Sequence, residues 1–371
     1  MKKIAIIIPT LTIGGGEKVA IQNANDLIAS GYDVSLIVPK GNIEYKIDSS
    51  ITLYSGKSKN LLSDLFFCKK MIKKVNPDTV ISYMERANFI NLIVYRKSPY
   101  EKIVSIHTVP SIAYKKRNYL NRIFIFITMY LIKKRSIPVI TISKGISKEL
   151  TKFYGIKKIF LIENYFTPPA VDNNNEIDSE IDSENISFAF VGRLDHIKGC
   201  DVFIEAIALS IKNNPSSKFD FWIIGDGEQK PYLLKLCENY NLESRVHFLG
   251  SRNDIPELLN RIDYLIIPSY VEGFGLVVLE GLYYGCSIIY SKCKYGPQEI
   301  LGEAYDIDDS YSFSDPSENK SYAIYELSEI INSIQTKRDN SKLNIKRKYV
   351  ISNYNKTSSI SKLKKLIGDD F

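Results

Sequence analysis

Residues 269–285 read SYVEGFGLVVLEGLYYG and come directly after an apolar run at 264–267. An apolar run, a turn with glycines and then apolar residues at helical spacing predict a buried strand, a loop and a helix. Glu272 lies in the loop, and Glu280 lies one to two turns into the helix. Because the helix is apolar on most sides, we expect Glu280 to be buried, where a carboxylate needs a polar partner.

The start of this helix favours an anionic ligand. The backbone N–H groups of residues 274–276 lack helical partners, and a helix N-terminus can bind phosphate. Glu280 could accept two hydrogen bonds from a ribose diol, and charge-assisted bonds contribute about 1.5–3 kcal/mol each. The alternative is that Glu280 is a capping or salt-bridge residue.

The same alternation of strand and helix runs along the whole chain. Apolar runs typical of buried strands occur at residues 4–9, 34–38, 79–82, 103–106, 139–142, 186–191, 219–224, 246–249, 264–267 and 287–290. Strands that alternate with helices indicate parallel sheets covered on both faces. We therefore expect an α/β fold of two doubly wound parallel-sheet domains, with ligands bound in the loops after the strands.

An acidic segment separates the two series of strands. Residues 172–185 read DNNNEIDSEIDSEN, which is polar and lacks aromatic side chains, as is typical of an exposed linker. The sequence thus predicts a first domain over residues 1–165, a linker over 166–185 and a second domain over 186–354.

Composition excludes several classes of protein. The 371 residues are 44% hydrophobic and 25% charged, unlike a disordered or fibrous chain. No apolar stretch reaches the roughly 18 residues of a membrane span. The five cysteines are odd in number and include no CxxC pair. A zinc site or disulfide framework is therefore not expected, and a reducing cytoplasm is favoured.

The net charge of +7 is unevenly distributed. Residues 1–165 hold 27 Lys+Arg and 11 Asp+Glu, a net charge of +16. Residues 166–371 hold 22 Lys+Arg and 31 Asp+Glu, a net charge of −9. The first half is therefore expected to face something anionic, such as nucleic acid, a membrane surface or a phosphorylated substrate.

Two further loops follow predicted strands. Residues 10–17, TLTIGGGE, could bring the backbone close to a phosphate, but an ordinary turn stabilised by Glu17 is an equal alternative. Residues 191–199, VGRLDHIKG, place Arg193 and Lys198 where two cations could hold a diphosphate. The alternative there is a solvated charge pair with Asp195.

Taken in order, these motifs resemble those of retaining glycosyltransferases of the GT-B fold, in glycosyltransferase family 4. TIGGGE, VGRLDHIKG and EGFGLVVLE match the family, and the last contains its Glu-x7-Glu motif. GDG at 225–227 and FLG at 248–250 also fit in order and spacing. The resemblance covers nearly the whole chain and is strongest over residues 187–299.

The resemblance implies two Rossmann-like domains that face each other across a cleft, with a last helix in residues 355–371 that returns to the first domain. The donor would be a nucleotide sugar, most commonly linked to UDP. Glu272 would lie against the transferred sugar, and His107, at the end of IVSIH, would reach its distal hydroxyl. A capping or core role for His107 is the alternative.

The donor-binding residues implied by the resemblance share the loops after the strands. Some would contact the diphosphate, Glu280 would bind the ribose and Arg252 the base. The full donor-binding set is Gly15, Gly16, Arg193, Lys198, Arg252, Phe274, Gly275, Leu276 and Glu280. No DxD pair suggests a metal ion, so we expect cations and N–H groups to stabilise the departing nucleoside diphosphate, with no cofactor required.

The acceptor is expected to bind the basic first half. Residues 115–135, KKRNYLNRIFIFITMYLIKKR, have basic ends and an apolar middle too short to span a bilayer. They predict either a helix on an anionic membrane surface or a buried helix. Lys69, Lys70, Lys73 and Lys74 form a second basic cluster. Nucleic-acid binding is not expected, because no such motif occurs.

The sequence therefore favours a cytoplasmic enzyme bound peripherally to the inner face of the membrane. It would move a hexose or N-acetylhexosamine from a nucleotide sugar to a lipid-linked or surface-polysaccharide acceptor, such as a capsule or lipopolysaccharide intermediate. The alternatives are a sugar-nucleotide epimerase on the same scaffold and a non-catalytic module that binds nucleotide sugars.

Overall fold

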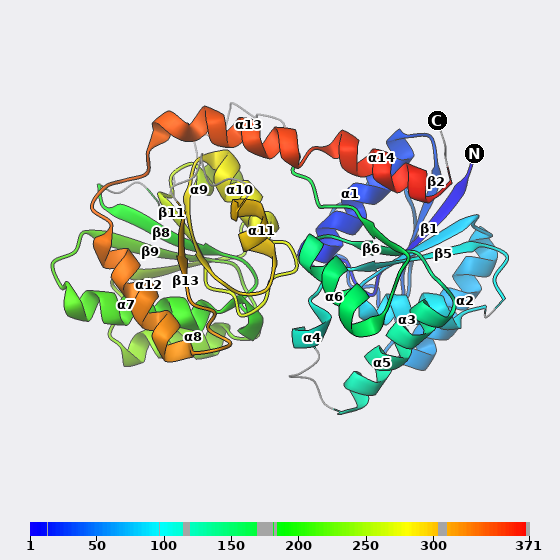
Figure 1. Cartoon of the computed structure of the whole chain (residues 1–371), viewed down its shortest axis with the longest axis horizontal. Coiled ribbons are helices and arrows are strands. Elements are labelled where there is room, and N and C mark those ends of the chain that lie inside the picture. Colours follow the sequence, from blue (N-terminus) through cyan, green and yellow to red (C-terminus); the bar gives the residue numbers. More distant parts are fainter. Residues whose placement is uncertain are drawn as a thin grey trace. The chain divides into compact units, whose positions relative to one another are not determined.

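The structure, a computed structural model, describes residues 1–12, 14–95, 97–113, 119–168, 181, 184–302 and 310–368. Its contacts divide the chain into two compact units (Figure 1). Unit 1 comprises residues 1–164 and 356–371, and unit 2 comprises residues 165–355. Most of the predicted acidic linker lies outside the described residues. Phe166, at its start, is buried and packs on the rings of Tyr283 and Tyr284 in unit 2.

Unit 1 is built on a parallel sheet with strand order β3-β2-β1-β4-β5-β6-β7. Its strands are β1 (Lys3–Ile7), β2 (Asp33–Val38), β3 (Thr52–Ser55), β4 (Thr79–Tyr83), β5 (Glu101–Ile106), β6 (Val139–Thr141) and β7 (Ile159–Leu161). In β1, Ile4 pairs with Val34 on one side and with Thr79 on the other. Ile4–Ile7 are fully buried, because helices cover both faces of a parallel sheet.

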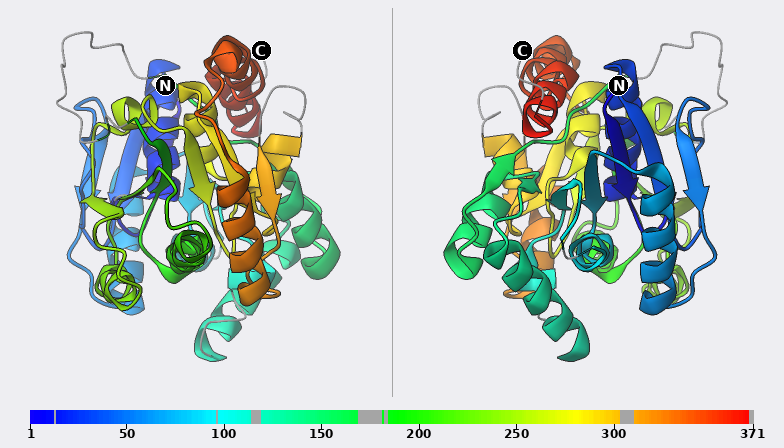
Figure 2. Two further views of the ribbon diagram at one scale, coloured as in Figure 1. Left: turned by 90° about the vertical axis from the view of Figure 1, so that its left-hand side faces the viewer. Right: turned by 90° about the vertical axis from the view of Figure 1, so that its right-hand side faces the viewer.

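The helices of unit 1 alternate with these strands (Figure 2). They are α1 (Gly15–Ala29), α2 (Leu61–Val75), α3 (Glu85–Ile93), α4 (Pro110–Ala113), α5 (Tyr119–Lys134), α6 (Lys144–Tyr154) and α14 (Lys356–Leu366). Local signals set their ends: α2 starts with a capping box between Asn60 and Ser63, and α6 ends at Gly155 in the left-handed conformation. Helices α2, α3 and α5 pack side by side, and α1 packs against α14.

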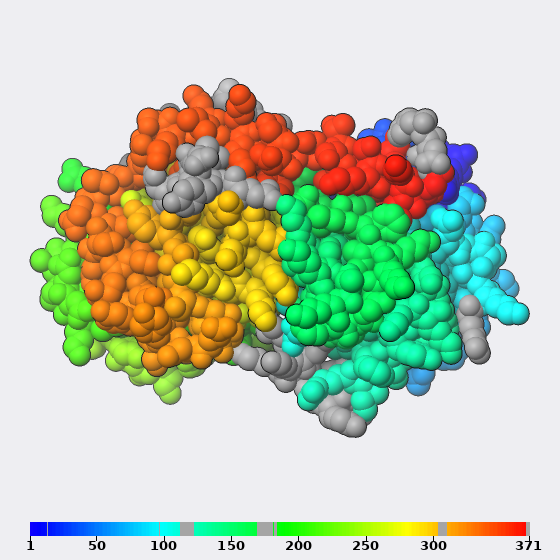
Figure 3. Space-filling view, viewed as in Figure 1, coloured from blue at the N-terminus to red at the C-terminus, as the bar shows by residue number. Residues whose placement is uncertain are grey.

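Helix α14 is far from the rest of unit 1 in sequence but is packed tightly into it. Leu363 and Ile367 are buried, and the Ser359 hydroxyl donates to the carbonyl of Glu163 at 2.8 Å. Lys356 forms an ion pair with Asp26 of α1. Figure 3 shows this helix, in red, at the surface of unit 1.

Unit 2 repeats the architecture with strand order β10-β9-β8-β11-β12-β13, again all parallel. Its strands are β8 (Ile186–Val191), β9 (Phe219–Ile224), β10 (Val246–Gly250), β11 (Tyr264–Ile267), β12 (Ser287–Ser291) and β13 (Tyr311–Phe313). Its helices are α7 (Cys200–Asn213), α8 (Lys230–Asn239), α9 (Ile255–Leu259), α10 (Leu276–Tyr284), α11 (Gly296–Gly302), α12 (Lys320–Ser333) and α13 (Leu343–Asn353), with short 3₁₀ turns at η1 (His196–Lys198) and η2 (Asn340–Lys342).

Two parallel α/β units confirm the predicted fold class. All five cysteines are unbridged and buried. None of the helices in the described residues is long and apolar enough to cross a membrane.

Candidate functional site

The carboxyl end of the sheet in unit 2 gathers most of the predicted site residues. All its strands run in the same direction, so the loops that follow β8, β9, β10, β11 and β12 meet at one edge. The motifs VGRLDHIKG, GDG and EGFGLVVLE follow β8, β9 and β11 respectively. Residues far apart in sequence are thereby brought within contact distance of one another.

A partly buried ion pair lies at this edge. The Lys198 ammonium, at the end of η1, donates to Oε1 of Glu272 at 2.5 Å. The Ser269 hydroxyl donates to the same oxygen at 3.0 Å. The Glu272 side chain is only 8% exposed and that of Lys198 is 27% exposed. A carboxylate buried to this extent is stabilised by both partners, and the cation remains reachable from solvent.

The backbone holds Glu272 in place on both sides. Its N–H donates to the carbonyl of Lys294 at 3.2 Å, and its carbonyl accepts from the N–H of Tyr295 at 3.0 Å. Gly296 follows, where a Cβ atom would lie 2.5 Å from the carbonyl oxygen of Phe274. Glycine at this position therefore allows the start of α11 to approach the loop that carries Glu272.

Arg193 lies in the loop after β8 and is held by Asp195. Its Nε donates to Asp195 at 2.7 Å, and the other oxygen of Asp195 accepts from the Lys198 backbone N–H at 3.2 Å. Asp195 therefore sets the shape of the loop as well as the direction of the arginine. About half of the Arg193 side chain is exposed, and this bond leaves its two terminal amino groups for a further anion.

Arg252, after β10, donates more hydrogen bonds to a neighbouring carboxylate than Arg193 does. Its Nε and Nη2 donate to the two oxygens of Asp254 at 2.8 and 2.7 Å. This two-pronged pair fixes the plane of the guanidinium. It leaves fewer N–H groups for a ligand than Arg193 has.

Helix α10 starts at the same edge. Gly275 precedes it with φ +94°, a left-handed conformation that favours glycine, and no side chain caps the helix. Leu276 opens the first turn, in which the Val278 N–H donates to the carbonyl of Gly275 at 2.9 Å. The first N–H groups of a helix precede any carbonyl that they could reach within the helix. Phe274 is buried against the ring of Tyr354, and Glu280 is half-buried one turn along the helix.

In unit 1 the glycine loop after β1 leads into α1. Gly15 and Gly16 are the first two residues of the helix. Glu17, in the first turn, is buried, and one of its carboxylate oxygens lies 2.5 Å from where a Cβ atom of Gly14 would be. The Tyr45 hydroxyl contacts the backbone N–H and carbonyl of Gly14 at 3.3 and 3.2 Å. Glu17 therefore stabilises the turn, and the glycines leave no side chain between the helix start and a ligand.

His107 follows β5 at the carboxyl end of the sheet in unit 1. Its Nε2 lies 2.8 Å from the Ser105 hydroxyl, and its ring lies 5.4 Å from the ring of Tyr83. Burial lowers the pKa of His107 to about 4, so the imidazole is neutral near pH 7. A neutral, oriented imidazole can exchange hydrogen bonds with a hydroxyl group.

The structure thus joins Lys198 directly to Glu272 and distributes the predicted residues over both units. Sequence reasoning missed the hydroxyls of Ser269 and Ser105, which carry no pattern of their own. Among the described residues there is no group of three or more His, Cys, Asp or Glu side chains placed to hold a metal ion.

Comparison with protein families gives two adjoining matches. Residues 13–166 match the family model "Glycosyltransferase Family 4", and residues 171–325 match "Glycosyl transferases group 1". The first model spans the glycine loop and His107. The second spans Lys198, Glu272 and the start of α10.

Relatives with assigned activities align over most of the chain. A Campylobacter jejuni protein is 26% identical over 82% of this chain and 84% of its own. It is an N-acetylgalactosamine-N,N'-diacetylbacillosaminyl-diphospho-undecaprenol 4-alpha-N-acetylgalactosaminyltransferase. The Escherichia coli UDP-Gal:alpha-D-GlcNAc-diphosphoundecaprenol alpha-1,3-galactosyltransferase is 28% identical over 78% of this chain and 79% of its own.

Solved structures share the fold. The crystal structure of WaaG, a glycosyltransferase involved in lipopolysaccharide biosynthesis, matches with a TM-score of 0.79. The match covers 99% of this chain and 100% of WaaG at 17% sequence identity.

Proposed function

Because the chain belongs to glycosyltransferase family 4 and has the GT-B fold, we propose that it transfers a hexose or N-acetylhexosamine from a UDP sugar to a lipid-linked or surface-polysaccharide acceptor. The names of the Campylobacter jejuni and Escherichia coli relatives, which include diphospho-undecaprenol acceptors, support this choice. The observation that carries the proposal is the Lys198–Glu272 pair at the carboxyl edge of the sheet in unit 2.

We assign the donor to this edge on grounds of charge. Transfer leaves a nucleoside diphosphate as the departing group, so the site must stabilise developing negative charge. Lys198, the free amino groups of Arg193 and the N-terminus of α10 supply positive charge there. The backbone N–H groups of Phe274, Gly275 and Leu276 would share in this contact. These groups would serve in place of a metal ion. Transfer activity that is unchanged when a metal chelator is added would support this proposal.

Glu272 is proposed to orient the transferred sugar. Lys198 and Ser269 both donate to Oε1, which leaves Oε2 as the oxygen that can accept from a sugar hydroxyl. Glu280 would accept from the ribose. Arg252 would contact the base.

Unit 1 is proposed to contribute His107, Gly15 and Gly16 to the donor and to bind the acceptor. The neutral His107 imidazole would accept or donate a hydrogen bond at a hydroxyl of the sugar. Gly15 and Gly16, at the start of α1, would allow the phosphates to approach backbone N–H groups.

We also propose that unit 1 binds the cytoplasmic face of an anionic membrane through α5 and α2. One face of α5 is packed inward, with Ile125 and Met129 buried. The opposite face is exposed and apolar and consists of Ile123, Phe126, Ile127 and Tyr130. Residues three, four and seven apart share one helical face. The inward face agrees with the buried-helix interpretation of this segment, and the exposed apolar face is the one that we propose to contact the membrane.

Helix α2 has a similar exposed face. Leu62 and Phe66 are exposed on it, followed by exposed lysines at 69, 70, 73 and 74. Helix α3 packs against both α2 and α5, so the two helices with exposed apolar faces belong to one layer. Apolar side chains flanked by lysines are typical of helices that lie on anionic lipid.

A panel of nucleotide sugars with polyprenyl-diphosphate-sugar acceptors tests the transfer. We expect UDP release that depends on both donor and acceptor. Conversion of the nucleotide sugar to an epimer without an acceptor would replace this proposal by the epimerase alternative. Binding without turnover over the whole panel would favour the non-catalytic module.

Vesicle sedimentation tests the membrane proposal. We expect binding to phosphatidylglycerol vesicles that weakens with salt, and much weaker binding for the Phe126→Ser/Tyr130→Ser variant. Tyr322→Ser/Tyr325→Ser is the matched control, because these two tyrosines are exposed on α12 of unit 2. Equal binding to neutral and anionic vesicles at all salt concentrations contradicts the electrostatic part of the proposal.

A further inference from the structure

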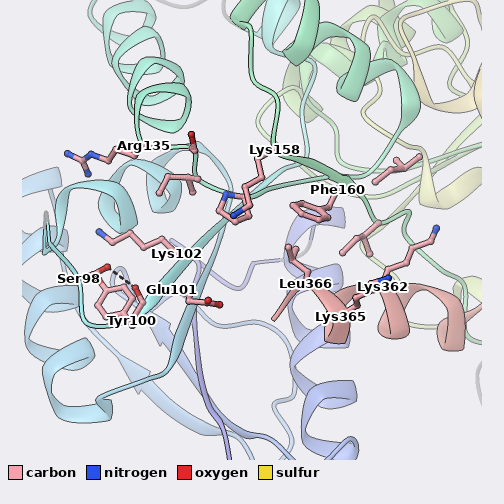
Figure 4. Close-up of a pocket in the computed structure, with 15 residues that line it drawn as sticks. Ser98, Tyr100, Glu101, Lys102, Arg135, Lys158, Phe160, Lys362, Lys365 and Leu366 are labelled. Atoms are coloured by element: carbon pink, nitrogen blue, oxygen red, sulfur yellow. Dashed lines mark hydrogen bonds between the residues drawn. The ribbon is translucent and has the colours of Figure 1, made fainter. Parts of the chain in front are cut away.

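A recess in unit 1 lies at the opposite end of the strands from His107. It has a volume of about 820 Å³ and is lined by the residues before and within β5, β6 and β7, the end of α5 and the end of α14 (Figure 4). Glu101 and Ile106 bound β5, and five residue steps of about 3.3 Å put roughly 16 Å of strand between them. The recess is therefore separate from the His107 end of the sheet, to which we assign contacts with the donor.

The recess gathers cations from four elements. Its lining contains a single carboxylate, Glu101, and the cations Lys102, Arg135, Lys158, Lys362 and Lys365. Like charges that converge in a concave surface raise the local potential and concentrate anions. Helix α14 adds Lys362 and Lys365 to a part of the chain that is already basic.

Two of these cations have structural tasks. The buried Lys102 ammonium donates to the carbonyls of Asn91, Val94 and Tyr95 at 2.7, 2.7 and 2.9 Å. Arg135 donates to the carbonyl of Leu92 at 2.6 Å. Together they satisfy the carbonyls at the end of α3, and they still contribute charge to the recess.

The other cations have little to neutralise them. Lys362 lies 3.8 Å from Glu163, a distance at the limit of an ion pair. Neither Lys158 nor Lys365 has an ion-pair partner among the described residues. In Figure 4, Lys158 lies between Lys102 and Arg135 on one side and Phe160 and Leu366 on the other. Phe160 is 37% exposed, so an apolar surface adjoins the lysines.

We propose that this recess is a second ligand site, which binds a phosphate ester that carries an apolar group. Lys158 and Lys365 contact the phosphate, and the apolar group packs on Phe160 and Leu366. The ligand then joins α14 to the start of β7. The phosphate ester can come from a lipid headgroup or from a soluble metabolite. Binding of a lipid would require the apolar group, whereas binding of a soluble metabolite would not.

The test measures binding to the full-length protein in saturating UDP, which removes any contribution from a nucleotide site. The probes are dihexanoyl-phosphatidylglycerol below its micelle concentration, glycerol phosphate and inorganic phosphate. Calorimetry measures the affinity of the protein for each probe. We expect the Lys158→Ala/Lys365→Ala variant to bind the lipid probe at least about 10-fold more weakly, or 1.4 kcal/mol. Lys57→Ala/Lys59→Ala removes the same charge from exposed positions of unit 1 outside the recess and should change nothing.

Phe160→Ala separates the two sources. If the ligand is a lipid, this variant should weaken binding of dihexanoyl-phosphatidylglycerol and leave glycerol phosphate unaffected. Equal affinity for the two probes, both lost in the lysine variant, assigns the site to soluble phosphate esters. Equal affinity of the wild type, the Lys158→Ala/Lys365→Ala variant and the control for every probe overturns the proposal.

Discussion

Replacing Lys198 by methionine is the sharpest test of the candidate site. The substitution nearly keeps the length of the side chain but removes the ammonium, and the Ser269 hydroxyl, at 3.0 Å, still donates to the Glu272 carboxylate. Removing one partner of a fully buried ion pair costs about 3–5 kcal/mol of stability. Because 27% of the Lys198 side chain is exposed, water can reach the carboxylate, and we expect about 2–3 kcal/mol.

This loss should be visible in thermal unfolding. For a unit of this size, each kcal/mol lowers the melting temperature by about 2–4 °C, so Lys198→Met should lower it by about 4–12 °C. The double variant Lys198→Met/Glu272→Gln removes both charges, and its loss should fall short of the sum of the single losses by at least about 1 kcal/mol. Lys212→Met, an exposed lysine at the end of α7, is the charge-matched control and should change stability by less than about 0.5 kcal/mol.

Transfer activity should behave differently from stability. Removing a donor that meets developing charge lowers kcat by about 10²–10³. The double variant should therefore lose less stability than the two single losses added together and should still not regain activity, as followed by UDP release. If Lys198→Met keeps kcat within threefold of the wild type while its melting temperature falls, the pair is structural and the assignment of Lys198 to the diphosphate is refuted.

Two further predictions concern His107 and the loop before α7. The pKa of His107 is lowered to about 4 in the folded protein, against about 6.5 in an unfolded chain, so the unfolded chain binds more protons as pH falls. The free energy of unfolding should therefore drop between pH 6.5 and pH 4. When the urea midpoint is plotted against pH, His107→Gln should flatten the curve over this range. An unchanged curve contradicts the buried, neutral imidazole. Gly199 has φ +70°, and Gly199→Ala places a Cβ atom 2.0 Å from the carbonyl oxygen of Pro268. This substitution should lower the melting temperature by at least about 4 °C. Gly302→Ala is the control and should not lower it, because no atom lies within 4 Å of its Cβ position.

The fold could be predicted from the sequence wherever a strand is buried on both faces. Each apolar run proposed above corresponds to a strand, because a strand covered by helices on both sides must be apolar throughout. The strands that sequence reasoning missed are β3, β7 and β13, each at an edge of its sheet. Most residues of these three strands are partly or fully exposed, so little in their composition distinguishes them from loops.

The candidate site was predictable in its residue types and not in its contacts. Lys198 and Glu272 lie 74 positions apart, and only the parallel order of β8 and β11 brings their loops together. The sequence predicts Asp195 only as a neutralising charge, whereas the structure shows that it also accepts from the backbone N–H of Lys198. Residues 115–135, with an apolar middle between basic ends, agree with two interpretations, because a helix with one buried and one exposed apolar face has the same composition as a fully buried one.

The return of α14 to unit 1 has a consequence for biosynthesis. Unit 1 is completed by residues 356–371, so a ribosome must first translate residues 165–355. At about 5–20 residues per second, roughly 10–40 s pass between the synthesis of Asn164 and that of α14. During this time the surface that later packs against Leu363 and Ile367 is uncovered, whereas unit 2 is continuous in sequence and can close as soon as it emerges. Nascent unit 1 is therefore the half of the chain that would depend on a chaperone.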